Sequence, residues 1–163
     1  MDFDSGAALR EWAQNLERAM NTTIGTDDSG AFGLNTKGGA PVVVEPVPGQ
    51  GAAVFSAGLG TVDQNTPAAV LQALLAANLQ PDVVGPAVLG LQPQDGTIAL
   101  RLIWTPSDEG WRYESFVDVL GAFGEQVDTL AAAIASGEIT RLLNGNAAPG
   151  AADGASFSTP QFA

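Results

Sequence analysis

The residue types that most often catalyse reactions or bind metal ions are missing from this chain or lack their usual neighbours. The sequence contains no His and no Cys, which removes imidazole acid–base chemistry, thiolate nucleophiles and the usual zinc ligand sets. Its serines lie outside any Gly-x-Ser-x-Gly motif. Its one lysine, Lys37, is part of neither a Ser-x-x-Lys motif nor a phosphate-binding Gly-Lys-Ser/Thr triplet. We therefore expect no cofactor and no metal site.

Carboxylates are the remaining candidates for chemistry. The segment Asp27-Asp28-Ser29-Gly30 lacks the ligand spacing and terminal Glu of an EF-hand, so it predicts a turn. Asp108-Glu109 and the pair Glu114 and Asp118 could supply an acid and a base, but their spacing is also typical of a solvent-facing surface. An enzyme that uses such carboxylates, a serine or Tyr113 stays an alternative. We expect no catalytic residue.

The charge balance limits the possible partners. Eighteen acidic residues against six basic ones give a net charge of −12, which argues against nucleic acid and anionic membranes as ligands. The acidic surface has two interpretations, either solubility or a carrier for a basic or aggregation-prone partner. The N-terminus is acidic and no apolar run reaches the about 18 residues of a membrane span, so a cytoplasmic protein is expected.

Apolar periodicity predicts three main helices. Leu9, Trp12 and Leu16 form a helical stripe within residues 4–20, and a second helix is expected over residues 67–79. A long helix over residues 111–135 carries a continuous apolar seam, whose members are Phe116, Leu120, Phe123, Val127, Leu130 and Ile134. This seam is interpreted as core, with a groove for a partner as the alternative.

Short alternating runs bounded by Gly and Pro predict five strands. They lie near residues 32–35, 42–44, 53–55, 86–91 and 97–104. The resulting order is α-β-β-β-α-β-β-α, which indicates an α+β fold with a twisted antiparallel sheet flanked by helices. Apolar surface in excess of one core predicts a homodimer. The domain is placed at residues 1–137 and a flexible Ala/Gly-rich tail at 138–163, where Phe157 and Phe162 are either a docking element or part of a disordered end.

Several segments resemble a known family in the right order. They are the helix Leu9–Met20, the turn and strand of residues 28–34, the helix end at residues 71–78, and the hairpin of residues 87–101. The most specific part is Leu74-Leu75-Ala76-Ala77-Asn78-Leu79, followed by a Gly-rich hairpin through Leu100. This pattern is similar to that of the class I type III secretion chaperones of the Tir chaperone (CesT-like) family, closely over residues 71–102 and by element order over about 1–137.

The resemblance implies a non-enzymatic homodimer of the bacterial cytoplasm that binds the N-terminal segment of a secreted effector and keeps it secretion-competent. Such a segment would add a strand to a sheet edge and insert apolar side chains into pockets. The effector-binding residues carried over by position are Leu9, Trp12, Ala13, Leu16, Phe32, Leu34, Val42 and Val44. The residues carried over for the dimer contact and the core behind it, which the sequence does not divide between the two, are Leu74, Leu75, Leu89, Leu91, Leu100, Leu102 and Trp104. A chaperone-fold adaptor or regulator outside effector export is the alternative.

Overall fold

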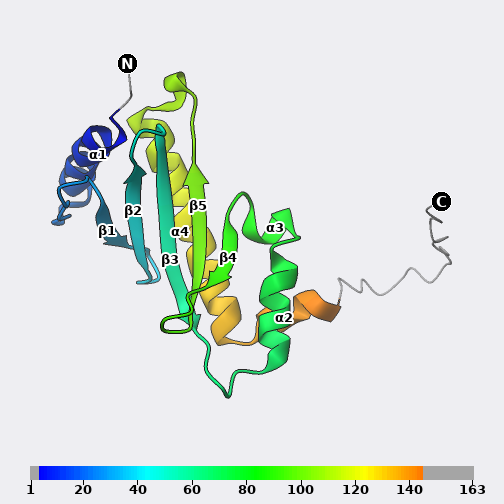
Figure 1. Ribbon diagram of the computed structural model, residues 1–163. Coiled ribbons are helices and arrows are strands. Elements are labelled where there is room, and N and C mark those ends of the chain that lie inside the picture. The colour runs from blue at the N-terminus through cyan, green and yellow to red at the C-terminus, as the bar shows by residue number, and fades with distance from the viewer. Residues whose placement is uncertain (1–3, 145–163) are drawn as a thin grey trace, which may run out of the picture.

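The computed structural model describes residues 4–144, which form a five-stranded antiparallel sheet flanked by helices (Figure 1). The order α-β-β-β-α-β-β-α is confirmed, and short helices that were not predicted are interspersed. The elements are α1 (Ser5–Met20), β1 (Phe32–Asn35), β2 (Pro41–Val47), β3 (Ala52–Thr61), α2 (Ala68–Ala77), α3 (Pro81–Val84), β4 (Val88–Leu91), β5 (Thr97–Trp104), η1 (Asp108–Gly110), α4 (Tyr113–Ala135) and η2 (Glu138–Asn144).

The sheet has the strand order β1-β2-β3-β5-β4, with every neighbouring pair antiparallel. One face is buried under helices because alternate strand residues point to it, among them Val44, Phe55 and Leu102, which are neighbours in the register. The opposite face carries the exposed side chains of Val43 and Ile103. The fold therefore has a helix-covered face and an open face.

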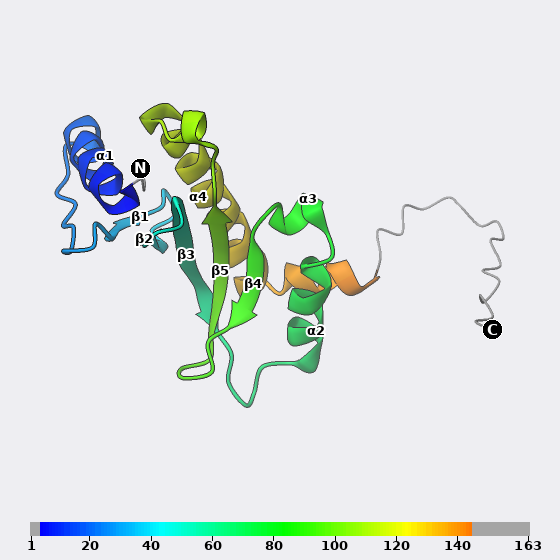
Figure 2. The ribbon, with the colours of Figure 1, turned by 45° about the horizontal axis from the view of Figure 1, so that its top comes forward.

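Helices α1 and α4 both pack on the covered face, α1 against β2 and α4 against β3 (Figures 1 and 2). Asp4 caps α1 by accepting a hydrogen bond from the Ala7 N–H at 2.9 Å. Trp12 of α1 joins the two helices, since its ring centroid lies 5.0 Å from that of Phe116 and 5.5 Å from that of Trp111. Aromatic contacts of this kind hold α1 against the start of α4.

The apolar seam of α4 is core, as interpreted from the sequence. Its buried members are Phe116, Leu120, Phe123, Val127 and Leu130, and Ile134 is partly buried against the same cluster. The spacing of three and four residues keeps these side chains on one face of the helix, which lies along the covered side of β3.

Helix α2 packs at the β4 edge of the sheet, together with α3 and η2 (Figure 2). The Asn78 side chain, just past the end of α2, joins this helix to β4: its amide oxygen accepts from the Leu89 N–H at 2.7 Å, and its amide nitrogen donates to the Leu89 C=O at 3.0 Å. Helix η2 differs from the predicted tail, which was to start at residue 138. Its Ile139 is buried, so the folded part continues to residue 144, and residues 145–163 lie outside the described residues.

Candidate binding surfaces

The polar side chains of the described part of the chain do not converge on a reaction centre. Across residues 4–144, no group of three or more His, Cys, Asp or Glu side chains could hold a metal ion, and no buried side-chain polar atom lacks a hydrogen-bond partner. Nor does any helix in this range have the length and apolar character needed to cross a membrane. The features that could act on another molecule are exposed apolar surfaces and sheet edges.

Two exposed Asp residues serve turns. Asp27 accepts hydrogen bonds from the Ser29 hydroxyl at 2.6 Å and from the Ala31 N–H at 2.9 Å, and these donors, the hydroxyl first, lower the pKa of Asp27. The backbone N–H of Thr97 donates to Asp95 and lowers the pKa of that carboxyl in the same way. Each carboxylate thus stabilises a chain reversal, and the predicted turn at residues 27–30 is confirmed.

The structure places most of the predicted effector-binding residues in the core. Seven of the eight are at most 6% exposed, namely Leu9, Trp12, Ala13, Leu16, Phe32, Val42 and Val44, whereas Leu34 is only partly buried. The prediction differed because periodicity identifies the apolar face of α1 and of the first strands, and that face packs on α4 and β3 within the same chain. A surface that is open to a partner must therefore be formed mainly by the less buried residues beside them.

Such a surface lies between α1 and α4, where Leu34 and Val42 form the floor of a groove of about 260 Å³. Met20 at the end of α1 and Val117 of α4 form its apolar walls. Gly121 leaves one wall open, because a Cβ built on it has no atom within 4 Å. We call this the α1–α4 groove. Val117 lies outside the predicted seam, one residue after its member Phe116, so apolar periodicity did not indicate it.

One end of the groove is closed by the β1–β2 turn, which is fixed to α4. The Asp128 carboxylate accepts hydrogen bonds from the Thr36 hydroxyl and, at 2.9 Å, from the Gly38 N–H. Lys37 and Glu125 also line this end. A charged rim at one end of an apolar groove favours a ligand that is apolar along its length and charged at one end.

The outer edge of β1 runs beside the groove. The Thr36 N–H bonds the Ala40 C=O across the hairpin, and backbone groups alternate in direction along a strand, so those of Gly33 and Asn35 point away from β2. Only an isolated bridge between Thr26 and Phe32 covers the start of this edge within residues 4–144. Beyond this bridge, Asn35 presents its outward backbone N–H and C=O to an added strand.

The predicted dimer residues are divided by the structure between core and surface. Leu74, Leu89, Leu100 and Leu102 are at most 8% exposed and Trp104 is partly buried, whereas Leu75 and Leu91 are 71% and 50% exposed. The division falls within α2, since the Leu74 side chain faces inward and that of Leu75, one residue on, faces solvent. The sequence could not make this division because α2 is apolar on both sides.

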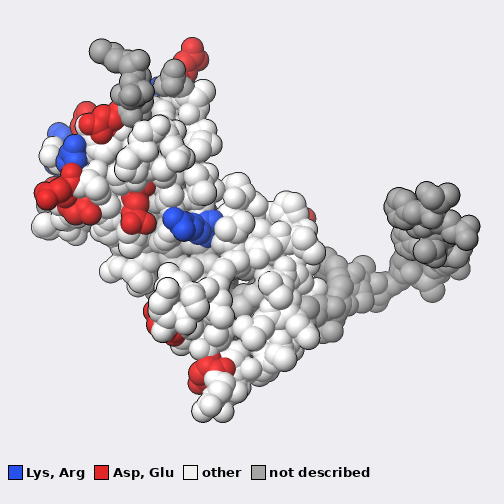
Figure 3. Space-filling view, in the orientation of Figure 1, with Lys and Arg blue, Asp and Glu red and all other residues white. Residues whose placement is uncertain are grey.

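The outer side of α2 and the turn that follows it carry three exposed Leu side chains, four residues apart. Leu71, Leu75 and Leu79 are 38%, 71% and 85% exposed, and we call them the α2 stripe. Helix α2 contains no charged residue, and the molecular surface over this edge of the molecule is nearly without charged side chains in Figure 3. The acidic residues visible in that view gather mainly over the α1 side. The α2 stripe is therefore an uncharged apolar surface of the kind that marks an interface.

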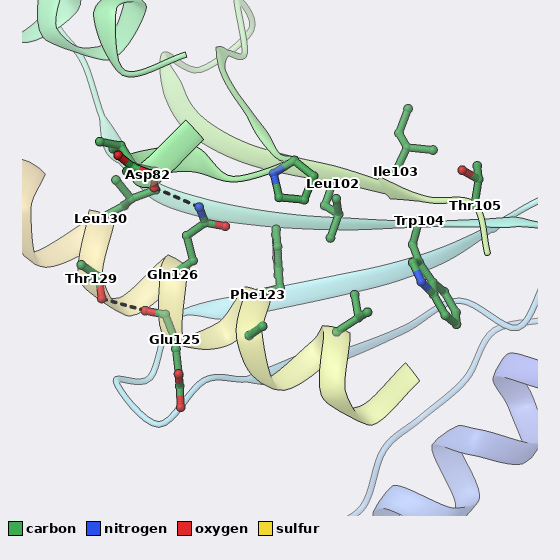
Figure 4. Close-up of a pocket in the computed structure, with 14 residues that line it drawn as sticks. Asp82, Leu102, Ile103, Trp104, Thr105, Phe123, Glu125, Gln126, Thr129 and Leu130 are labelled. Atoms are coloured by element: carbon green, nitrogen blue, oxygen red, sulfur yellow. Dashed lines mark hydrogen bonds between the residues drawn. The ribbon is translucent and has the colours of Figure 1, made fainter. Parts of the chain in front are cut away.

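A second hollow, of about 740 Å³, lies between β5, α3 and α4 (Figure 4). Leu102 and Trp104 point into it from β5, and Phe123 rises from α4 toward them. The Gln126 side chain donates to the Val83 C=O at 2.9 Å and connects α4 to α3 at one end. We call this hollow the β5–α4 cleft. No sequence pattern indicated this cleft, because it is formed by the spacing of three separate elements in the tertiary structure.

Comparisons with known proteins agree on the architecture. The profile of the Tir chaperone protein (CesT) family matches residues 11–107. The fold is similar to a chain of the HopA1–SchA chaperone–effector complex, with a TM-score of 0.60, 15% identity, and coverage of 78% of this chain and 96% of that chain. It is also similar to a chain of the ExsC–ExsE complex, with a TM-score of 0.63, 11% identity, and coverage of 81% and 97%.

A third similar structure is YbjN of E. coli, described as a putative transcription regulator. Its TM-score is 0.57, with 18% identity and coverage of 81% of this chain and 92% of that chain. No curated protein sequence matches the chain. At these identities the structural likeness establishes the fold, and the profile match, which spans more than half of the chain, establishes the family.

Proposed function

Because this chain belongs to the Tir chaperone protein (CesT) family, we propose that it is a type III secretion chaperone of the bacterial cytoplasm. It binds the N-terminal chaperone-binding segment of one or more effectors and keeps them soluble and secretion-competent. The observation that carries this proposal is the family match, together with apolar surfaces and sheet edges in place of a reaction centre. The chain acts as a binding protein and not as a catalyst.

The effector segment binds at the β1 edge. Backbone groups of Asn35 face outward there, beyond the bridge at Phe32, so an extended segment can add a sixth strand by main-chain hydrogen bonds. A residue paired beside Leu34 would point to the covered face and place its side chain in the α1–α4 groove. This site lies next to the predicted effector-binding residues. It is formed by residues at the edge of the apolar face of α1 and β1, and not by the buried residues at the centre of that face.

The chain forms a homodimer through the α2 stripe. Burial of an apolar side chain the size of Leu contributes about 1.5–3 kcal/mol, and a two-fold axis repeats each contribution. Among the large apolar side chains whose exposure the structure describes, those of Leu75 and Leu79 are the most exposed, so they gain most from a partner. An isologous contact of two uncharged helices also avoids repulsion between copies that each carry a net charge of −12.

Two charge substitutions separate the two surfaces. Leu34→Asp places a carboxylate in the α1–α4 groove and is expected to abolish effector binding while the dimer persists. Leu75→Asp is expected to give a monomer, and Ala69→Asp, an exposed position on another side of the same helix, serves as its control. Dimer mass is measured by light scattering, and binding by co-purification with the N-terminal 100 or so residues of a secreted protein encoded beside this gene.

Two results would change the proposal. If no neighbouring secreted protein binds and the protein is a monomer, the export function is wrong. If the dimer forms but binds no exported protein, the alternative of a chaperone-fold adaptor or regulator outside export gains support. Thermal unfolding of each variant checks that loss of binding does not come from loss of folding.

A further inference from the structure

Strand β4 is shorter than the strand it pairs with. Its register with β5 ends at the pair of Val88 and Arg101, and β5 continues to Trp104. On its other side β5 pairs with β3 as far as Ala53. Over its last three residues, β5 therefore has a strand neighbour on one side only among the elements of residues 4–144.

The backbone of Ile103 points to this vacant side. The Thr97 C=O accepts from the Gln92 N–H, which places the outward groups of Thr97 on the β4 side of β5. The Leu89 backbone, in turn, is bound by Asn78 and faces away from β5, in keeping with the same alternation. Since the direction repeats every two residues, the N–H and C=O of Ile103 also face the β4 side, beyond the end of β4.

Strand β4 cannot extend to fill the position. The Ala87 N–H donates to the Val84 C=O at 3.0 Å, which turns the preceding residues into α3. Gly85 adopts a φ of 56°, a left-handed conformation that breaks the line of the strand. The vacancy is therefore a fixed feature of the fold and is bounded by α3.

The vacant position opens onto the β5–α4 cleft. A strand residue paired with Ile103 would point to the open face, and its two neighbours, beside Leu102 and Trp104, would point into the cleft. Val119 and Phe123 of α4 supply the apolar wall opposite. The volume of about 740 Å³ lies within the about 300–1,000 Å³ of ligand pockets, which is ample for two side chains.

The charges around the cleft indicate which segment fits. Asp82 is exposed at one end of the lining, which contains no Lys and no Arg, whereas the Glu125 carboxylate points away from the cleft in Figure 4. We propose that the β5–α4 cleft binds an extended segment of a partner protein with the pattern apolar-x-apolar flanked by Lys or Arg, which pairs with Ile103 as an added strand. This site is separate from the β1 edge and does not rest on the export function. The chain's own residues 145–163 contain no basic residue, and the α2 stripe of a second copy carries no charge, so neither matches.

The proposal is tested with a fluorescein-labelled peptide, Gly-Arg-Leu-Thr-Leu-Arg-Gly, by fluorescence anisotropy on the full chain. Ile103→Pro removes the outward N–H and leaves the hydrogen bonds to β3 in place, whereas Ile103→Thr keeps the N–H. We expect saturable binding, weakened about ten-fold or more by Ile103→Pro and about two-fold or less by Ile103→Thr. The Asp82→Asn variant should weaken binding roughly two-fold or more, most strongly at low salt.

Hydrogen exchange identifies the occupied edge. Protection of the Ile103 amide on addition of the peptide supports the proposal, provided that the unfolding curve of the Ile103→Pro variant shows a folded protein. A peptide with Glu in place of both Arg residues is expected to bind at least three-fold more weakly, since charge complementarity is lost. The proposal is overturned if the Ile103→Pro variant binds the peptide as tightly as the wild type, or if the peptide protects amides of β1 and not that of Ile103. It is also overturned if protection of the Ile103 amide rises with protein concentration in the absence of peptide, because a second copy would then be the occupant.

Discussion

Asn78 connects the end of α2 to the β4 edge strand through two hydrogen bonds to the Leu89 backbone, at 2.7 and 3.0 Å. Asn78→Ala removes both partners at once. Leu89 is 8% exposed, so its backbone N–H and C=O are left with little access to water. A buried polar group without a partner costs about 1–3 kcal/mol. Because β4 is an edge strand, water can replace part of the lost hydrogen bonding. We therefore expect Asn78→Ala to lower the free energy of unfolding by about 2–3 kcal/mol.

Urea unfolding followed by circular dichroism measures this loss. With a slope of about 2 kcal/mol/M, the midpoint should fall by roughly 1–1.5 M. The control is Gln72→Ala, an exposed position on α2, which should change the free energy of unfolding by less than about 0.5 kcal/mol. Protein concentration is held constant, since dimer formation would otherwise shift the midpoint.

Asn78→Asp separates the two hydrogen bonds. The carboxylate still accepts from the Leu89 N–H but turns an oxygen toward the Leu89 C=O, so at neutral pH we expect a loss at least as large as for alanine. Exchange of the Leu89 amide should quicken in the alanine variant. An Asn78→Ala protein with the wild-type midpoint and unchanged Leu89 exchange would refute the reasoning, because it would show that these bonds contribute nothing net.

Three further outcomes are expected. Gly30→Ala should lower the free energy of unfolding by well over about 1 kcal/mol, because Gly30 has a φ of 94° and a Cβ there would lie 2.4 Å from a backbone oxygen of α1. Gly25→Ala, whose Cβ meets no atom within 4 Å, should be close to neutral in the same urea titration. Asp128→Ala should cost about 1–2 kcal/mol and speed exchange of the Gly38 amide, since it releases the β1–β2 turn from α4. The pKa of Asp27 is lowered in the folded state, so its carboxylate stabilises the fold at pH values above the unfolded pKa of about 3.9. This contribution is lost as the pH falls through the folded pKa. The Asp27→Asn variant should therefore lose less thermal stability between pH 5 and pH 2 than the wild type does.

Much of the fold follows from local patterns. The bounds of β5 match the predicted strand, and α4 matches the predicted helix to within two residues, because alternation by two and by three to four distinguishes these elements over such lengths. The helix end at Leu74–Leu79 and the hairpin after it also carried the family resemblance. The structure adds a physical role for one letter of that pattern, since Asn78 bonds the hairpin it precedes.

The short helices α3 and η2 were missed. Helix α3 has four residues and η2 has seven, both too few to show a clear period. Its order comes from burial of Ile139, a long-range contact that composition does not report. Local propensity is weak in both segments, and tertiary packing decides their conformation.

The candidate surfaces, too, depend partly on local sequence patterns and partly on tertiary packing. The sequence by itself determined which side chains share a face: the stripe of α1, the seam of α4, and the two apolar sides of α2. Only the tertiary structure decided what covers each face. It packed Trp12 of the α1 stripe against Phe116 of α4, turned Leu74 inward and Leu75 outward, and ended β4 before β5. The physical reason is that a repeat in the sequence fixes direction relative to one element, whereas exposure depends on how far its neighbours in space extend.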